Sequence, residues 1–251
     1  MIINYLKYFL YLFRKIFFFI KHKNLFFLIH FFKTELVKIK NRYLIKKFKS
    51  KLNMTIDDYL NQSFVTHNEK TKKWFIHNIV YIFSMIEKFD LNSIKNEILE
   101  IGSFEGNSSI FFLKNIKDSN ITCVDIWSDD FTSGNKNRKL EFSEIKKNFE
   151  LNLSPFKDRL TVHKITSNEF FKINKNKFDL IYVDGSHVFE DVLNDGNNSI
   201  KILNHNGLII FDDFLKDEVF LAILEFYKKN KKNLKVEYIY HQAIFRYKEM
   251  Y

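Results

Sequence analysis

The stretch Asn96-Glu97-Ile98-Leu99-Glu100-Ile101-Gly102-Ser103-Phe104-Glu105-Gly106-Asn107-Ser108-Ser109 decides the fold of this chain. Its first half is an apolar run typical of a buried strand, and glycines punctuate the turn that follows. Gly102 and Gly106 permit backbone conformations and close approaches that a side chain would block, and residues 107–109 can cap a helix over residues 110–113. We therefore predict a strand, a ligand-cradling turn and a helix. The turn alone does not name the ligand.

The composition describes a chain that can bury one substantial core. Its 251 residues are 46% hydrophobic and 18% aromatic, which is enough for a single α/β domain with an appendage. The single cysteine, Cys123, excludes an intramolecular disulfide bond and a multi-cysteine zinc site. We expect Cys123 to be a core residue of a cytoplasmic protein.

The positive charge of the chain is concentrated at its N-terminus. Residues 1–51 carry thirteen Lys and Arg against one acid, Glu35, whereas the whole chain has a net charge of +10. The remaining 200 residues are therefore slightly acidic, with a net charge of −2. This distribution argues against a nucleic-acid partner for the main part of the chain.

The N-terminal tail alternates aromatic clusters with basic residues. Its apolar runs are all shorter than the ~20 residues that span a bilayer, so we expect no transmembrane helix. Two alternatives stay open. The tail packs on the domain or on a second subunit, or it forms an interfacial helix whose aromatic residues enter an anionic membrane surface. The second alternative would place the protein peripherally at the inner membrane surface.

Apolar strands alternate with helices from residue 96 onward. We divide the chain into a basic aromatic helical tail (1–51), a helical lead-in (52–95) and a main domain (96–251). The predicted strands are residues 98–101, 121–125, 160–163, 178–184, 207–212, 234–240 and 243–247. The predicted helices are residues 74–89, 108–115, 138–152, a short one near 168, 190–203 and 217–230. This order indicates a doubly wound, mostly parallel seven-stranded sheet with helices on both faces. Only two residues separate the last two strands, so a C-terminal hairpin should make the final strand antiparallel to its neighbour.

Acidic residues lie at the ends of four predicted parallel strands: Glu100, Asp125, Asp184 and the pair Asp212-Asp213. Ligands of doubly wound sheets bind outside the carboxyl ends of the strands, so we expect these acids to line one crevice. The turn after the first strand lacks the third glycine of the Gly-x-Gly-x-x-Gly fingerprint, which argues against a dinucleotide. The other acids of this region are expected to be solvated or to cap helices: Glu105, Glu190, Asp191 and Asp195.

Four segments together resemble the class I S-adenosylmethionine-dependent methyltransferases. They are residues 100–106 (EIGSFEG), 123–127 (CVDIW), 179–187 (DLIYVDGSH) and 207–214 (GLIIFDDF). They are similar in particular to the branch that includes the metal-dependent macrolide and aminocoumarin sugar O-methyltransferases. The resemblance covers about residues 96–248 and implies a Rossmann-like methyltransferase domain that binds S-adenosylmethionine.

The resemblance implies which residues hold the cofactor. Glu100, Gly102, Ser103 and Gly106 would surround its methionine part and ribose, and Asp125 would accept hydrogen bonds from the ribose hydroxyls. Further contacts are implied for Ile126 and Trp127 beside the adenine, for Ser167 near the adenine amine, and for Asp184. The acidic residue that such enzymes usually place near the adenine amine is missing beside Ser167.

The resemblance also implies a divalent cation, Mg²⁺. Asp184, Asp212 and Asp213 match the ligand set of this branch, and three carboxylates suit a hard cation. The cation would bind two adjacent hydroxyls of a small-molecule or glycan acceptor and lower the pKa of one of them. His187, with Asp184 beside it, would act as the general base that takes the proton.

The sequence therefore predicts an S-adenosylmethionine-dependent O-methyltransferase that acts on a vicinal diol such as a sugar or a catechol-like ring. Two alternatives remain: an RNA methyltransferase that uses the basic tail, and a non-catalytic scaffold that keeps the fold and the cofactor. The slightly acidic domain and the lack of a base-stacking aromatic motif argue against the first. The second would bind the cofactor without turnover.

Overall fold

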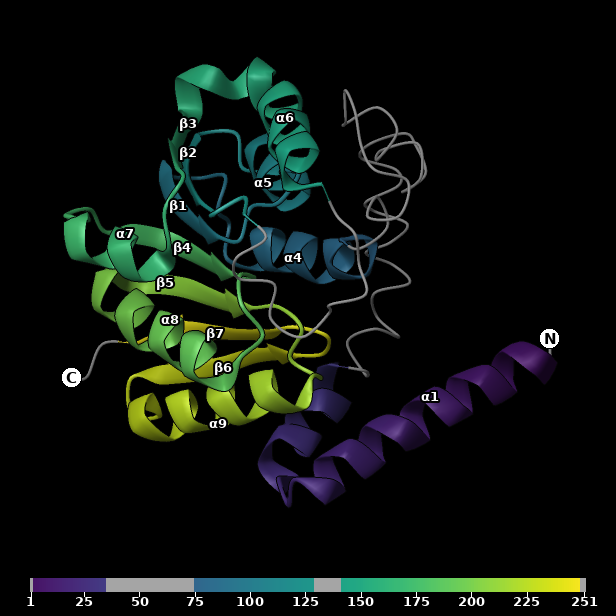
Figure 1. Cartoon of the computed structure of the whole chain (residues 1–251). Coiled ribbons are helices and arrows are strands. Elements are labelled where there is room, and N and C mark those ends of the chain that lie inside the picture. The colour runs from purple at the N-terminus through teal and green to yellow at the C-terminus, as the bar shows by residue number, and fades with distance from the viewer. Residues whose placement is uncertain (1, 35–74, 129–140, 249–251) are drawn as a thin grey trace.

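The computed structural model describes residues 2–34, 75–128 and 141–248, which form a seven-stranded sheet flanked by helices (Figure 1). The strands are β1 (Asn96–Ile101), β2 (Ser119–Val124), β3 (Leu160–His163), β4 (Phe178–Val183), β5 (Leu203–Phe211), β6 (Leu234–Ile239) and β7 (Ala243–Tyr247), in the order β3-β2-β1-β4-β5-β7-β6. Strands β1 to β5 pair in parallel, and β7 is antiparallel to both β5 and β6. The predicted doubly wound sheet with an antiparallel C-terminal hairpin is confirmed.

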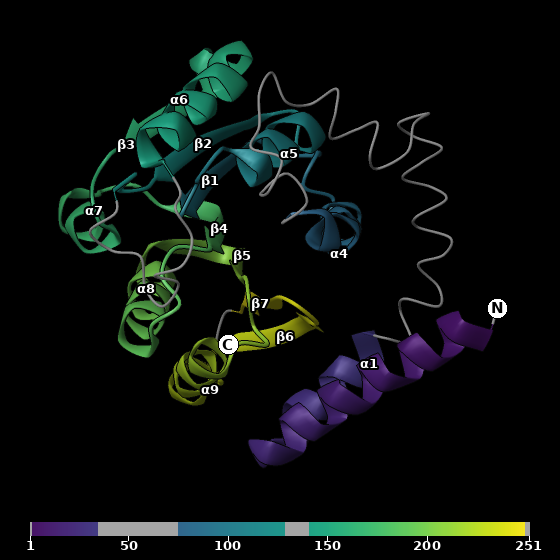
Figure 2. The same cartoon turned by 45° about the vertical axis from the view of Figure 1, so that its right-hand side comes forward.

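Helices cover both faces of this sheet (Figure 2). On one face lie α4 (Ile76–Lys88), α5 (Asn107–Asn115) and α6 (Phe142–Leu153), and on the other α7 (Ser167–Ile173), α8 (Phe189–Ile202) and α9 (Asp217–Asn230). Side chains of each strand alternate between these layers. Ile98 and Tyr182 pack in the first layer, and Leu99 and Ile181 pack in the second. Because both faces are buried, the parallel strands are apolar along most of their length.

The element boundaries agree with the sequence prediction within a few residues, with one addition. A 3-10 helix, η2 (Ser154–Arg159), follows α6 directly. Pro155 lies in its first turn, where its fixed φ and missing N–H are tolerated. This element was not predicted, because its six residues are too few to show an apolar period.

The N-terminal tail packs beside α9 as two helices, α1 (Ile2–Lys21) and residues 25–34 (Figure 1). Phe19, Phe27 and Phe31 are fully buried. The ring of Phe27 contacts Phe214 edge-on, with ring centroids 5.4 Å apart, and Phe220 at 6.0 Å. Thus one side of this helical pair belongs to the core of the domain.

A polar contact fixes the turn between these two helices. Lys21 Nζ lies 2.7 Å and His22 Nε2 lies 2.9 Å from the carboxylate of Asp217, in the first turn of α9. Among the helices that the structure describes, none combines the length and the apolar character needed to cross a bilayer.

Gly102 lets the turn after β1 touch the end of β4. Its φ is +86°, a region that favours glycine. A Cβ at this position would lie 2.2 Å from the backbone oxygen of Asp184, far inside van der Waals contact. Gly102 N–H also donates to Val124 O at 2.8 Å. One glycine thereby joins the ends of three strands.

Replacing Gly102 with alanine should lower the free energy of unfolding by about 2–4 kcal/mol, because the Cβ would force the ends of β1 and β4 apart at a strained φ. Urea unfolding followed by circular dichroism measures this loss. Gly185→Ala is the matched control, since the nearest atom to its Cβ would be a side-chain carbon of Ile101 at 3.3 Å, and it should cost less than about 1 kcal/mol. Equal losses in the two variants would contradict this account.

Candidate functional site

The residues predicted for the site lie along the edge of the sheet where the parallel strands end. Backbone hydrogen bonds extend one residue beyond the strands: Gly102 N–H to Val124 O (2.8 Å), Asp184 N–H to Ile101 O (2.8 Å), Asp212 N–H to Val183 O (3.0 Å) and Asp125 N–H to His163 O (3.2 Å). Each first residue after a strand is therefore placed by the neighbouring strand. The expected meeting of acids at one edge follows from this register.

Asp125 ties the turn after β1 to the end of β2. Its Oδ2 accepts from Phe104 N–H at 2.9 Å, and its Oδ1 accepts from Trp127 N–H at 2.8 Å. Burial raises the pKa of Asp125, while these backbone bonds counteract the rise. Asp125 and the neighbouring Ile126 are both half-buried residues. The lone pairs of the Asp125 carboxylate that these bonds do not use can accept further hydrogen bonds.

The turn itself is built from two glycines and a buried serine. Gly106, with φ +83°, is the N-cap of α5, and its N–H donates to Ser103 O at 2.7 Å. The predicted cofactor residues Gly102, Ser103 and Gly106 thus lie in one tight turn next to Asp125. This turn presents the N-terminus of α5 toward the edge of the sheet.

Trp127, which follows β2, supports this turn and packs against α6. Its indole N–H donates to Phe104 O at 2.9 Å, and its ring centroid lies 4.8 Å from that of Phe149. Only 4% of Trp127 is exposed. Contact with an adenine stays a prediction for this residue, and its packing places the ring within the core.

Glu100 lies behind the turn and is fully buried. Its carboxylate accepts hydrogen bonds from the hydroxyls of Ser108 and Ser109, in the first turn of α5, and the thiol of Cys123 lies 3.6 Å away. Burial raises the pKa of Glu100, although these hydroxyls lower it. In this position Glu100 fastens α5 to β1, and its predicted contact with a cofactor stays a prediction.

Two acids expected at the surface are buried. Glu105 is inaccessible and accepts from Asn148 Nδ2 at 2.8 Å. Asp195, in α8, is 2% exposed and lies near Ser167, the first residue of α7. The expectation that both are solvated or capping groups is wrong. Glu105 faces α6 and Asp195 faces the start of α7, and neither neighbour can be deduced from the local sequence.

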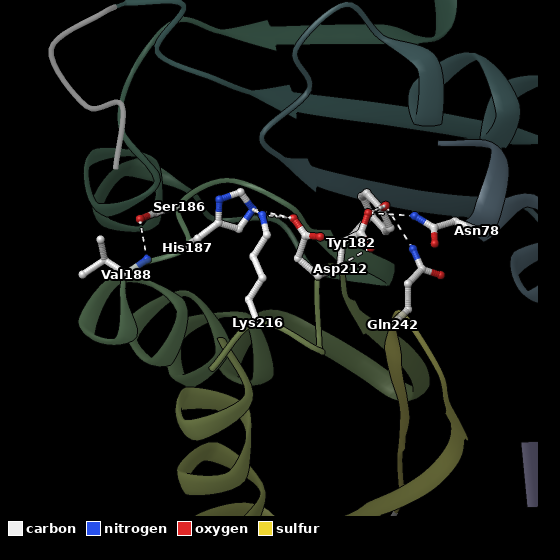
Figure 3. Close-up of polar contacts among 9 residues, drawn as sticks. Asn78, Tyr182, Ser186, His187, Val188, Asp212, Lys216 and Gln242 are labelled. Carbon is white, nitrogen blue, oxygen red and sulfur yellow. Dashed lines mark hydrogen bonds and ion pairs between the residues drawn. The ribbon is translucent and has the colours of Figure 1, made fainter. Parts of the chain in front are cut away.

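The remaining acids form a cluster with His187. Asp184, His187 and Asp213 each offer a ligand atom, and these atoms all lie within 4.8 Å of one another. His187 Nε2 is 2.7 Å from Asp213 Oδ2. Lys216 Nζ lies 2.5 Å from the same oxygen and 3.1 Å from His187 Nε2 (Figure 3). Burial raises the pKa of Asp213, but His187 and Lys216 outweigh it and hold this pKa at about 2.

Asp212 faces a second, more buried group (Figure 3). Its Oδ2 accepts from the Tyr182 hydroxyl at 2.7 Å and from Asn78 Nδ2 at 2.8 Å. Gln242 Nε2 in turn donates to the Tyr182 oxygen at 3.0 Å. These three polar partners come from α4, β4 and the β6–β7 turn, and the sequence analysis missed all of them.

Asp184 and Asp212 influence each other directly. Burial, followed by the charges of Asp212 and Asp213, raises the pKa of Asp184 well above its ordinary value, and burial and the charge of Asp213 raise the pKa of Asp212. The charge of Asp212 therefore disfavours the ionised form of Asp184. A cation bound at this cluster would find carboxylate oxygens of Asp184 and Asp213, ligands of the kind that Mg²⁺ prefers. The donor set therefore fits the predicted ion.

Lys216 is a further residue of this cluster that was not predicted from the sequence. It is the N-cap residue of α9 and lies three positions after Asp213. The sequence does place this lysine three residues after the predicted acidic ligands. Because lysine and arginine are frequent throughout this chain, that position alone did not indicate a role for Lys216.

Comparisons with known proteins agree with this architecture. Residues 99–214, somewhat less than half of the chain, match the family described as "Methyltransferase domain". Protein R132 of Acanthamoeba polyphaga mimivirus is 27% identical over 138 residues, which are 55% of this chain and 58% of that protein. This chain thus matches somewhat more than half the length of that curated relative.

Three solved structures have a similar fold. The O-methyltransferase TomG of Streptomyces achromogenes, in complex with SAM, is 12% identical with a TM-score of 0.53 and is covered to 96% by 77% of this chain. The SAH-bound methyltransferase PaMTH1 of Podospora anserina is 14% identical with a TM-score of 0.51, covered to 94% by 77% of this chain. The O-methyltransferase NovP is 16% identical with a TM-score of 0.51, covered to 80% by 68% of this chain.

The family match and the shared fold agree with each other. Residues 99–214 match a methyltransferase family model, and the sheet has the fold of these three solved methyltransferases.

The buried Asp195 should make stability depend on pH. Burial, with a smaller contribution from the charge of Asp191, raises its pKa to about 7, so between about pH 4 and 7 the native protein keeps a proton that the unfolded chain has lost. The contribution of Asp195 to stability therefore falls as pH rises, by up to about 1.4 kcal/mol per pH unit. Asp195→Asn removes this contribution, so its stability relative to wild type should increase from pH 5 to 7 in urea unfolding. The exposed Glu190→Gln on the same helix should follow the wild-type profile, and parallel profiles for Asp195→Asn would contradict the assignment.

Proposed function

We propose that this protein transfers a methyl group from S-adenosylmethionine to a hydroxyl of a small-molecule or glycan acceptor with vicinal hydroxyls. The observation that carries the proposal is the convergence of Asp184, His187 and Asp213 next to the turn at Gly102. The turn proposed for the cofactor and the acids proposed for the acceptor are then joined by the backbone contact between Gly102 and Asp184. A methyl donor and its acceptor need this proximity, because positioning supplies much of the rate of such a transfer.

The cofactor side of the proposal uses the turn and Asp125. Gly102, Ser103 and Gly106 would approach the methionine part and ribose through their backbone, and Asp125 would accept from the ribose hydroxyls. The position of Asp125 beside the turn, as a half-buried residue, supports this role. Glu100 would act indirectly, by holding the first turn of α5 in place.

The acceptor side would be organised by Asp184, Asp212 and Asp213. These carboxylates would hold a divalent cation such as Mg²⁺, whose chemistry is to orient two adjacent hydroxyls and lower the pKa of one. His187 would take the proton of that hydroxyl. Its Nε2 lies 2.7 Å from Asp213 Oδ2, an arrangement in which the carboxylate orients the ring and stabilises the imidazolium.

The proposed reaction balances as an in-line displacement. The acceptor oxygen forms a bond to the methyl carbon while the carbon–sulfur bond breaks, and the electron pair stays on sulfur. The products are the methyl ether and S-adenosylhomocysteine, and the proton of the hydroxyl passes to His187. No oxidant or reductant is needed.

Asp184→Asn should lower methyl transfer to a panel of glycosides and catechols by about 100-fold or more, because it removes an acid next to the acceptor. Asp125→Asn should instead weaken S-adenosylmethionine binding by about tenfold in calorimetry, as expected for a charged hydrogen-bond partner. The exposed Asp158→Asn serves as the control for both measurements. Full turnover by Asp184→Asn would contradict the acceptor assignment, and cofactor binding without turnover by the wild type would favour the scaffold alternative.

We further propose that the N-terminal helices dock on an anionic membrane surface, where a lipid-linked or glycan acceptor would be presented. The support is an exposed apolar face opposite the buried one. On α1 this face consists of Leu10, Phe13, Phe17 and Ile20, and on the next helix of Leu25, Phe26, Ile29 and Phe32. Phe13 and Phe17 are 60% and 62% exposed.

Basic residues accompany this apolar face. Arg14, Lys23 and Lys33 are exposed beside it, and residues 1–51 together hold the excess positive charge of the chain. Aromatic side chains suit the headgroup region of a bilayer, and each basic group contributes ~1 kcal/mol near an anionic surface. This combination supports the proposal of a peripheral position at the inner membrane surface.

The double variant Phe13→Glu/Phe17→Glu should lose flotation with vesicles that contain phosphatidylserine, because it places two negative charges in the docking face. Ile173→Glu, at an exposed apolar residue of α7, is the matched control and should float like the wild type. Size-exclusion chromatography tests the other occupant, a second copy of the chain. A wild-type protein that stays at the bottom of the gradient together with the double variant would refute membrane docking.

A further inference from the structure

Lys216 lies where a bound cation would have to lie in this cluster. Its ammonium nitrogen is 2.5 Å from Asp213 Oδ2 and 3.1 Å from His187 Nε2, and Asp213 Oδ2 also accepts from His187 at 2.7 Å. Mg²⁺ binds its oxygen ligands at 2.0–2.1 Å. Asp213 Oδ2 therefore cannot serve a metal ion and keep both of these contacts.

The charge of Lys216 is also matched to the cluster. It is among the groups that lower the pKa values of Asp213 and Asp184. These two acids and Asp212 would otherwise repel one another at the end of the sheet, so one positive charge stabilises their ionised forms. The structure thus holds a cation of its own at the acids that match a metal-ligand set.

The side chain of Lys216 has a route away from the cluster. It is 49% exposed, and the backbone of Lys216 is held separately, by donation from its N–H to Asp213 O at 2.9 Å. Rotation of the long side chain toward solvent would release Asp213 Oδ2 from the ammonium without disturbing the start of α9, leaving His187 as its one contact of the two. The flexible, strongly hydrated ammonium of lysine suits such a movement.

We propose that Lys216 is the resident cation of this cluster, and that a divalent cation binds Asp184 and Asp213 only after the Lys216 ammonium has left Asp213. This inference rests on the metal site of the proposed function. Metal affinity is then set by competition between two cations for one carboxylate. A low affinity of the wild-type protein is a built-in property of the sequence.

Titration of Mn²⁺ into the full-length protein without S-adenosylmethionine, followed by electron paramagnetic resonance of the free ion, tests the competition. Lys216→Met should bind Mn²⁺ at least about tenfold more tightly than the wild type, because the substitution removes a positive charge that repels the metal ion. Lys216→Arg keeps the charge and should bind like the wild type. Lys21→Met is the control for a nearby charge, since Lys21 contacts the adjacent Asp217 and not Asp213, and it should change the affinity by less than about twofold.

Circular dichroism confirms that each variant is folded before titration. Unchanged or weaker Mn²⁺ binding by Lys216→Met would overturn the proposal, as would an equal gain in Lys21→Met. Binding of Mn²⁺ is measured without cofactor or acceptor, so its outcome is independent of whether methyl transfer is found. A failure of the catalytic proposal therefore shows itself in a different experiment.

Discussion

The contact between Gly102 and the backbone of Asp184 is the constraint on which the rest of the site depends. It brings the turn after β1 against the end of β4, at a distance that leaves no space for a Cβ. The turn carries the residues proposed for the cofactor, and β4 leads into the acids proposed for the acceptor. Because the contact is made by backbone atoms, the two halves of the site are positioned by the sheet itself and not by adjustable side chains.

The N-terminal tail is connected to the same site through α9. Phe27 packs on Phe214, the residue after Asp213, and Lys21 binds Asp217, the residue after Lys216. The loop between β5 and α9, which supplies Asp213 and Lys216 to the acid cluster, is thus held from outside by the tail. It is also fastened by Phe214 N–H, which donates to His241 O at 2.8 Å. The tail is a support of the site as well as a candidate docking surface.

The sequence predicted those features that depend on local pattern. The alternation of strands and helices followed from the apolar runs. The meeting of Asp125, Asp184 and Asp212 at one edge followed from parallel strands having their carboxyl ends together. Lys216 was not identified and Asp195 was wrongly expected to be solvated or capping, because the environment of each is made by segments far away in the chain. Glu100 shows the same limit: its position at the strand end was predicted, but its hydroxyl partners required the packing of α5 on β1.

The acids of the site also stabilise the backbone of three neighbouring residues that have positive φ. Phe104, Trp127 and Asp213 have φ values of 49°, 42° and 51°, which cost bulky residues of the order of 1 kcal/mol or more. Each donates its N–H to a carboxylate of the edge, the first two to Asp125 and the third to Asp212. Bonds from a backbone N–H to a charged acceptor are strong enough to offset such strain. The acids therefore fix the conformation of the loops around them. A ligand that binds the same carboxylates must leave these hydrogen bonds in place if the loop conformations are to be retained.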